Sequence, residues 1–277
     1  MGFKLTYSPR RQDVQSMTTE DLRAAFVIGE LFGSGPIQWT FTDLDRLAVA
    51  GVRPAGALTL ENERQTGSEF FLARRELGIL NIGGAGVVRA DGRTFQVETH
   101  DCLYVSMGTR EVTFESPDRH APAKFYCVST PAHQAFATTL VTKAQVTPVA
   151  LGSKATANER KIYQYIHEKG IRSSQLVMGF TELAEGSVWN TMPCHTHTRR
   201  TEIYMYFDVA PGNIIAHFLG MPQQTRHVFL QSDEVVLSPS WSIHTGVGTG
   251  NYRFCWAMGG ENQDYNDMDK VEPGDLR

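Results

Sequence analysis

The sequence predicts an all-β protein made of two antiparallel β-barrel or jelly-roll halves with a few short helices. From about Leu44 onward, short apolar or alternating runs are separated by glycine, aspartate and proline, which is typical of antiparallel strands joined by turns. The predicted strands recur at even spacing, and two distant segments resemble one another. The length of 277 residues allows one large domain or two ordinary ones.

The first predicted element is a short helix near the start of the chain. Thr18 precedes an acidic pair and the apolar residues Leu22 and Phe26, which indicates a capped helix start. The clearest strand pair is a hairpin over residues 87–97, because Asp91-Gly92 accepts the positive φ of a tight turn. Further strands are expected at residues 102–105, 111–114 and 124–128.

A polar, proline-bearing stretch over residues 131–160 interrupts this pattern and predicts a connector. We therefore expect an N-terminal half, residues 1–150, and a C-terminal half, residues 151–277. Strands resume in the second half at residues 175–180, 202–207, 214–219, 227–230, 235–237 and 252–257.

The two halves share a short sequence pattern. Arg74-Arg75-Glu76 leads into the apolar residues 77–80, and Arg199-Arg200-Thr201-Glu202 leads into residues 203–206. Glycine-bearing turns and further strands follow in both halves, which predicts a duplicated barrel unit. The N-terminal half contains no His-x-His, so we expect it to lack a metal site of this kind and to serve as scaffold.

Composition excludes several classes of function. The net charge of −4 without a Lys/Arg run argues against nucleic acid as a partner. No stretch reaches the roughly 18 apolar residues of a membrane span, and residues 1–11 have no apolar segment of a secretory signal. Four cysteines without a C-x-x-C pair favour reduced thiols, so a cytoplasmic location is expected.

The most informative residues are His195, His197, Glu202 and His244. Residues two apart on a strand face the same way, so the two histidines present both imidazoles to one side. Glu202 lies five positions after His197, and a bend between them is needed to return its carboxylate to that side. Three imidazoles and a carboxylate suit zinc, iron, manganese or nickel without choosing among them.

A chance His-x-His without a metal is the alternative interpretation. The following glutamate and the histidine five residues after Pro239 favour a metal, because together these residues match the cupin pattern. On the strand after the bend, Glu202, Tyr204 and Tyr206 should share one face. The Cys194 thiol should face away from the site as a buried group, and His217 is more simply a packed histidine than a fifth ligand.

Three longer segments and the tail resemble the 5-keto-4-deoxyuronate isomerase family, a family of bicupins. They are residues 74–86, 189–197, 238–244 and 260–277. The resemblance implies conversion of 5-keto-4-deoxyuronate (4-deoxy-L-threo-5-hexosulose-uronate) to 3-deoxy-D-glycero-2,5-hexodiulosonate in bacterial pectin breakdown. It also implies one Zn²⁺ per chain on His195, His197, Glu202 and His244, and a homo-oligomer, in that family a hexamer.

Such a reaction needs a base that carries a proton between adjacent carbons and a cation for the substrate carboxylate. Glu76, Tyr204 and Tyr206 are the candidate bases, and each is also compatible with a purely structural role. Arg199 and Arg200 are the candidate carboxylate binders, or else a solvated surface pair. Proton transfer and hydride shift both remain open from the sequence.

Two other functions fit the same ligand pattern. An iron- or manganese-dependent cupin dioxygenase uses three histidines and a glutamate as well, and oxygen uptake would distinguish it from an isomerase. A non-catalytic cupin that binds a sugar acid would need a signalling partner domain, and the sequence has no residues left for a DNA-binding helix-turn-helix.

Overall fold

The computed structural model describes residues 3–33 and 35–277. Its contacts separate two compact units. Unit 1 contains the chain up to Thr6, Glu30–Thr147 and Tyr165–Met178, and unit 2 contains Tyr7–Gly29, Pro148–Gln164 and Gly179–Arg277. Each unit thus takes in a segment from the other side of residue 150, and the division into domains at that residue stays a prediction.

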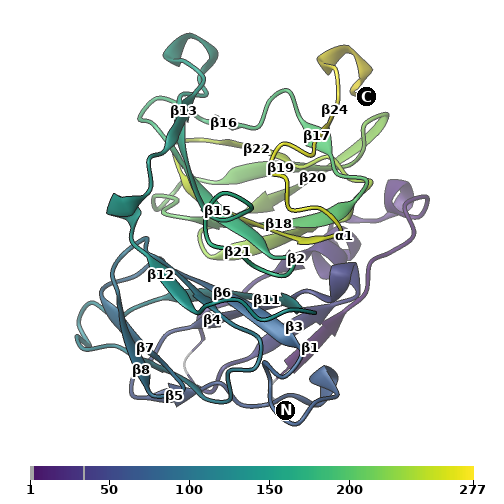
Figure 1. Ribbon diagram of the computed structural model, residues 1–277. Helices are drawn as coiled ribbons and strands as arrows, with labels where there is room; N and C mark the ends of the chain where they lie inside the picture. Colours follow the sequence, from purple (N-terminus) through teal and green to yellow (C-terminus); the bar gives the residue numbers. More distant parts are fainter. Residues whose placement is uncertain (1–2, 34) are drawn as a thin grey trace. The chain divides into compact units, whose positions relative to one another are not determined.

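Unit 1 consists of a seven-stranded and a four-stranded sheet (Figure 1). The larger sheet has the order β1-β3-β4-β11-β6-β9-β12: Phe3–Thr6, Trp39–Thr42, Ala48–Val52, Phe125–Pro131, Arg75–Asn81, Cys102–Val105 and Thr139–Val141. The smaller sheet has the order β5-β10-β7-β8: Leu58–Thr59, Val112–Glu115, Gly86–Ala90 and Arg93–Val97. An apolar core that includes Trp39, Leu77, Val88 and Phe125 joins residues of both sheets.

Unit 2 repeats this arrangement. Its seven-stranded sheet has the order β13-β14-β15-β23-β18-β21-β2: Val149–Leu151, Arg160–Ile166, Val177–Leu183, Arg253–Gly260, Arg200–Phe207, Glu234–Ser238 and Val27–Ile28. Its four-stranded sheet has the order β16-β22-β19-β20: Trp189–Asn190, Thr245–Gly248, Ile215–Met221 and Gln224–Leu230. A small separate pair joins β17, His195–Thr196, to β24, Asp269–Lys270.

The two sheet orders correspond strand for strand, which confirms the predicted all-β fold with two similar halves. Strand β6 in the first half and β18 in the second both lie near the middle of their large sheets, and every residue in both strands is buried. Each of these strands is covered on both faces, so even polar residues such as Glu202 lie inside the protein. This is how unit 2 brings ionisable groups into its interior.

The short local elements follow the predictions from sequence. The hairpin of β7 and β8 turns at Asp91 (φ 45°) and Gly92 (φ 77°), the backbone that an Asp-Gly turn adopts most easily. Helix α1, Thr19–Phe26, begins with a reciprocal capping box between Thr18 and Asp21. No helix among the described residues is long and apolar enough to cross a membrane.

The chain passes from unit 1 to unit 2 between Thr147 and Pro148, inside the predicted connector of residues 131–160. This connector also contains strands β12 and β13 together with short 3₁₀ turns, because its residues pair at the edges of both large sheets. Strand β22, Thr245–Gly248, follows His244 directly. His244 itself lies just before that strand rather than within it.

Candidate metal centre

The structure brings together the side chains of His195, His197, Glu202 and His244. Each offers one ligand atom, the four atoms lie within 4.8 Å of one another, and all four residues are buried. His195 lies on β17, His197 in the bend that follows, Glu202 on β18, and His244 at the entry to β22. The predicted bend between His197 and Glu202 is present and returns the carboxylate to the histidine side.

Strand pairing and backbone hydrogen bonds fix these four positions. Glu202 is paired on both sides, with Ser238 of β21 and Met258 of β23, so its backbone cannot shift along the sheet. The His197 backbone amide donates to the Ser240 carbonyl at 3.1 Å, which joins the bend to the segment that carries His244.

The separations between the donor atoms suit a single divalent ion. His195 Nε2 lies 3.1 Å from His197 Nε2 and 3.0 Å from His244 Nε2. Glu202 Oε2 lies 2.7 Å from His197 Nε2, 2.9 Å from His244 Nε2 and 3.9 Å from His195 Nε2. Donors about 2.1 Å from a tetrahedral zinc ion are roughly 3.4 Å apart, a value inside this range.

Hydrogen bonds on the far side of two rings support this fit. His197 Nδ1 lies 2.7 Å from the Asp267 carbonyl oxygen, and His244 Nδ1 lies 3.3 Å from that of Ser242. A carbonyl oxygen only accepts, so each Nδ1 carries hydrogen and the Nε2 of each ring faces the cluster. His195 Nε2 faces two other Nε2 atoms, and one hydrogen cannot satisfy both contacts. A divalent cation accepts all four lone pairs at once.

The electrostatics of the cluster keep the glutamate ionised and one imidazole neutral. Burial opposes the charge on Glu202, but His244 and the two other histidines hold the pKa of Glu202 well below its usual range. Burial, aided by the charge of His244, lowers the pKa of His195. Ionised carboxylate and neutral imidazole are the forms that bind a metal.

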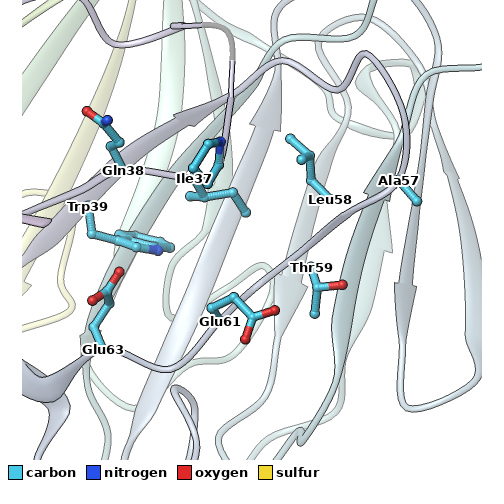
Figure 2. Close-up of a pocket in the computed structure, with 9 residues that line it drawn as sticks. Ile37, Gln38, Trp39, Ala57, Leu58, Thr59, Glu61 and Glu63 are labelled. Atoms are coloured by element: carbon cyan, nitrogen blue, oxygen red, sulfur yellow. The ribbon is translucent and has the colours of Figure 1, made fainter. Parts of the chain in front are cut away.

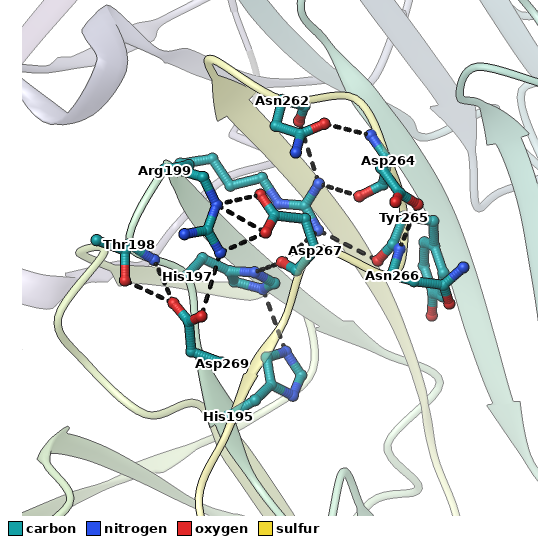
Figure 3. A network of polar contacts seen from close by, with 11 residues as sticks. His195, His197, Thr198, Arg199, Asn262, Asp264, Tyr265, Asn266, Asp267 and Asp269 are labelled. Atoms are coloured by element: carbon teal, nitrogen blue, oxygen red, sulfur yellow. Dashed lines mark hydrogen bonds and ion pairs between the residues drawn. The ribbon is translucent and has the colours of Figure 1, made fainter.

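A C-terminal segment, residues 262–269, covers one side of the cluster and is held by two arginines (Figure 3). The Arg200 guanidinium is buried and donates to four backbone oxygens, those of Asn262, Asp264, Tyr265 and Asp267. Arg199 Nε donates to both carboxylate oxygens of Asp267 at 2.7 and 2.8 Å, and Arg199 Nη2 donates to Asp269 at 3.1 Å.

Both guanidinium groups bind acceptors of this chain and position residues 262–269. Their predicted role as binders of a substrate carboxylate stays a prediction. The consequence for the metal centre is direct, because the Asp267 carbonyl that Arg200 holds also accepts the hydrogen of His197 Nδ1.

The two tyrosines predicted on the Glu202 face lie there, with ring centroids 6.2 Å apart. The Tyr206 hydroxyl and His217 Nδ1 share a hydrogen bond of 2.7 Å, and His217 is fully buried, as expected for a packed histidine. Burial raises the pKa of both Tyr204 and Tyr206 well above the usual range. Both hydroxyls are therefore protonated in the metal-free protein.

Glu76, the third candidate base, belongs to unit 1. Its carboxylate accepts from the Tyr104 and Thr130 hydroxyls and from the backbone amides of residues 174–176, at 2.6–3.1 Å. Five donors satisfy this buried carboxylate and anchor the 174–176 loop. Such contacts favour a structural role for Glu76.

Cys194 occupies the position expected for it. Its side chain is fully buried and packs against Ile243 and Val271, away from the donor atoms of its neighbour His195. Burial raises the pKa of this thiol, so it stays protonated and apolar.

The metal centre opens into a cavity of about 180 Å³ in unit 2. Drug-sized ligands occupy roughly 300–1,000 Å³, so this cavity suits a small metabolite. Its lining includes His195 and Glu202 together with Arg160, Asn190, Thr191, Tyr204, Tyr265 and Met268. Neither Arg160 nor Asn190 was predicted as a site residue. Arg160 ends the predicted connector of residues 131–160, and Asn190 belongs to no recognisable motif.

Unit 1 contains a larger cavity of about 520 Å³, lined by Ile37, Trp39, Leu58, Glu61 and Glu63 among others (Figure 2). Its lining has no histidine or cysteine, and its two carboxylates come from a single short stretch of chain. The cavity in unit 2 is the better candidate for chemistry, because it combines a buried metal-ligating group with convergent polar side chains.

The repeated two-sheet unit and the buried group of three histidines and a glutamate define a bicupin with a candidate metal centre. Similar folds occur in an IolB-like protein from Salmonella typhimurium LT2 (TM-score 0.73, 13% identity, 89% of this chain and 96% of that chain) and in Lactobacillus farciminis oxalate decarboxylase (TM-score 0.57, 13% identity, 82% and 79%). The chain belongs to the KduI/IolB family, whose model matches residues 26–272.

A curated relative from Opitutus terrae is 50% identical to this chain over 277 residues, which cover 99% of this chain and all of that protein. It is named 4-deoxy-L-threo-5-hexosulose-uronate ketol-isomerase.

Proposed function

We propose that this protein is a metal-dependent ketol-isomerase that converts 4-deoxy-L-threo-5-hexosulose-uronate to 3-deoxy-D-glycero-2,5-hexodiulosonate. The observation that carries the proposal is the full-length 50% identity to a relative named for this isomerase activity. The buried cluster and the small cavity beside it provide a site of suitable size and chemistry. Breakdown of pectin is the setting that the substrate indicates.

The proposed metal is one Zn²⁺ held by His195, His197, Glu202 and His244. The nitrogen-rich donor set supports zinc, and other divalent ions fit the same ligands. When bound, the ion supplies Lewis acidity that stabilises negative charge developing on substrate oxygens.

The chain's own residues must bind the substrate and transfer one proton between its carbons. The exchange moves hydrogen from C2 to C1 while the carbonyl passes from C1 to C2, so the atoms balance without any oxidant. Tyr204 is the candidate of the original three that lines the cavity, and its protonated hydroxyl suits hydrogen bonding to a substrate oxygen. Tyr206 is hydrogen-bonded to His217, and its ring lies edge to face with that of Tyr204.

An assay with purified, zinc-loaded protein tests this function. We expect isomerisation of the uronate without oxygen uptake, loss of the activity after chelation, and recovery when zinc is returned. Oxygen consumption with the uronate would support the dioxygenase alternative instead. Binding of the uronate without turnover would support the non-catalytic alternative.

Isomerisation in heavy water tests the route of the proton. Transfer through a solvent-exchanging group places deuterium at C1 of the product, and this is the expected result. A hydride shift leaves C1 free of deuterium and would contradict the proton-transfer route. Single substitutions of Glu76, Tyr204 and Tyr206 then identify the group; we expect Tyr204→Phe to lower kcat most while zinc stays bound.

Four free cysteines, all buried, support a reducing compartment and hence a cytoplasmic enzyme. A homo-oligomer, by resemblance a hexamer, stays a prediction that light scattering can measure.

A further inference from the structure

The cavity of about 520 Å³ in unit 1 shares no lining residue with the cavity beside the metal centre (Figure 2). Its volume lies within the roughly 300–1,000 Å³ of sites for small molecules. Ile37 and Leu58 give it apolar walls, and Trp39, Glu61 and Glu63 contribute polar groups. The metal centre leaves this cavity without a task.

The two glutamates of the cavity come from one short stretch of chain. Glu63 has extended backbone, with φ −113° and ψ 141°, and side chains two positions apart in such backbone point the same way. Asn62 between them is engaged elsewhere, since its Nδ2 donates to the Ser68 carbonyl at 2.7 Å. Within residues 3–33 and 35–277, neither carboxylate accepts a hydrogen bond or forms an ion pair. Both are therefore available to hydrogen-bond donors of a ligand.

Trp39 provides a second, independent observation in the same cavity. It begins β3, its side chain is 1% exposed, and its ring packs against that of Phe71 with 4.5 Å between centroids. Figure 2 shows the indole extending toward the space among Ile37, Glu61 and Glu63. Among the described residues, Trp39 Nε1 has no hydrogen-bond partner. A buried N–H without an acceptor is uncommon in a folded protein, and it indicates that an oxygen of a ligand completes the site.

The donor and the two acceptors together select the class of ligand. An acid accepts from the Trp39 N–H, but the carboxylates of Glu61 and Glu63 repel it. A simple cation pairs with the glutamates, but the electropositive edge of the indole disfavours it and the N–H still lacks an acceptor. A hydroxyl group both donates and accepts. A neutral ligand with several hydroxyls therefore satisfies all three groups at once.

We propose that this cavity of unit 1 binds a neutral saccharide. One hydroxyl oxygen accepts from Trp39 Nε1, other hydroxyls donate to Glu61 and Glu63, and the C–H groups of the sugar ring contact Ile37 and Leu58. The site is a binding site, and its preference is opposite to that of the metal centre, whose proposed substrate is an acid. The proposal uses residues of unit 1 alone and stands independently of the isomerase assignment.

Fluorine NMR of zinc-loaded protein labelled with 5-fluorotryptophan observes this cavity directly. The chain has four tryptophans; Trp39 lines the cavity of unit 1 and Trp256 lines the cavity beside the metal centre. The Trp39 resonance is assigned from its loss in Trp39→Phe, and the Trp256 resonance in the same way. Methyl β-D-glucoside, methyl β-D-galactoside, sucrose and trehalose are the probes, because they have no free carbonyl that an isomerase could use. We expect saturable shifts of the Trp39 resonance, with that of Trp256 unchanged.

Two charged probes test the ligand class. Methyl β-D-glucuronide differs from the glucoside by its carboxylate, and 1,4-diaminobutane carries positive charge without hydroxyls. We expect neither to shift the Trp39 resonance at concentrations at which a neutral sugar saturates it. The proposal is overturned if no neutral probe shifts this resonance, if the glucuronide binds there as tightly as the glucoside, or if the diamine alone binds.

Matched variants connect the binding to the glutamates. Glu61→Gln and Glu63→Gln keep the size of the side chain and remove its charge, so each should weaken binding of the neutral sugar about 10-fold in calorimetry, as expected for a hydrogen bond to a charged group. Glu69→Gln is the control, because Glu69 is exposed and lies outside the cavity lining; less than about a twofold change is expected. Equal affinities in Glu63→Gln and Glu69→Gln would overturn the proposal.

Trp39→Phe removes the N–H and keeps an aromatic ring. We expect it to weaken binding of the neutral sugar about 3- to 10-fold, the effect of losing one hydrogen bond. Because Trp39 also packs in the apolar core, a loss of folding in this variant would leave the glutamine variants to decide. An unchanged affinity in folded Trp39→Phe would show that the indole N–H does not contact the sugar and would contradict the proposed site.

Discussion

At the scale of single residues, the candidate ligands could be predicted because strand periodicity and spacing determine their directions. His195 and His197 are two apart, and the bend before Glu202 follows from its odd offset. The partners of Arg199 could not be predicted, since Asp267 lies 68 positions away and returns only through the fold. The short distance in sequence between an arginine and the ligands does not determine which acceptor its guanidinium binds.

The first prediction at this scale concerns metal retention. His197→Ala and Glu202→Ala should each abolish tight zinc binding, because either change removes one of four buried donors. Cys194→Ser should retain zinc, since its side chain packs against Ile243 and Val271 instead of facing the cluster. Metal analysis of purified variants checks both; a full equivalent of zinc in either alanine variant would refute the ligand assignment.

The second prediction at this scale concerns the contribution of His217 to the pH dependence of folding stability. Burial lowers the pKa of His217 to about 3 from an unfolded value of 6.5. A histidine with a lowered folded pKa stabilises the protein above the unfolded value, and that contribution is lost as the pH falls from about 6.5 toward 3, by up to roughly 1.4 kcal/mol per pH unit.

Urea unfolding of metal-free protein across this pH range measures the effect. His217→Gln keeps an acceptor for Tyr206 but has no titrating ring, so its stability should fall less steeply with acid than that of wild type. Parallel curves for the two proteins would show that His217 does not carry this pH dependence.

At the scale of elements, strands and tight turns were predictable because their patterns are local. The Asp91-Gly92 hairpin and the Thr18 cap depend on a few adjacent residues. Residues 262–269 have no such pattern: their shape is set by Arg200, whose guanidinium collects four of their carbonyl oxygens. An irregular segment of this kind is determined by its anchor, which the sequence does not reveal.

This anchoring leads to a prediction about zinc affinity. Arg200→Lys should weaken zinc binding about 10- to 100-fold, the usual effect of losing a group that orients a ligand histidine, because the Asp267 carbonyl is then no longer held against His197. Arg199→Lys is the control: Arg199 is 39% exposed and its ion pairs are worth little, so less than about a threefold change is expected. Competition with a chromogenic chelator gives both affinities, and equal losses would contradict the distinction.

At the scale of the whole molecule, one architecture serves two different interiors. Both β6 and β18 begin with a buried arginine, Arg75 and Arg200; two residues further on, unit 1 places Leu77 in an apolar core and unit 2 places Glu202 in the metal cluster. The duplication was visible in the sequence as a brief repeat. The correspondence of all the strand orders was not, because strand pairing depends on contacts distant in sequence.

The different interiors predict one tightly bound zinc per chain. Leu77 and its neighbours leave the core of unit 1 without donors equivalent to the histidine cluster. Elemental analysis of zinc-saturated, desalted protein should therefore give about one equivalent, falling to none in Glu202→Ala. Two equivalents, or one that persists in that variant, would show that unit 1 also binds metal.

The path of the first thirty residues affects how the protein can be made. Strand β2 pairs with β21, whose residues lie more than 200 positions later in the chain. In this way β2 forms the edge of the large sheet of unit 2. During synthesis on the ribosome, β2 is made early, whereas its pairing strand β21 is translated near the end. A fragment that starts at residue 148 would expose the backbone of β21 at an open edge, a template for self-association. Splitting the gene between its two similar halves is therefore a poor route to an isolated metal-binding module.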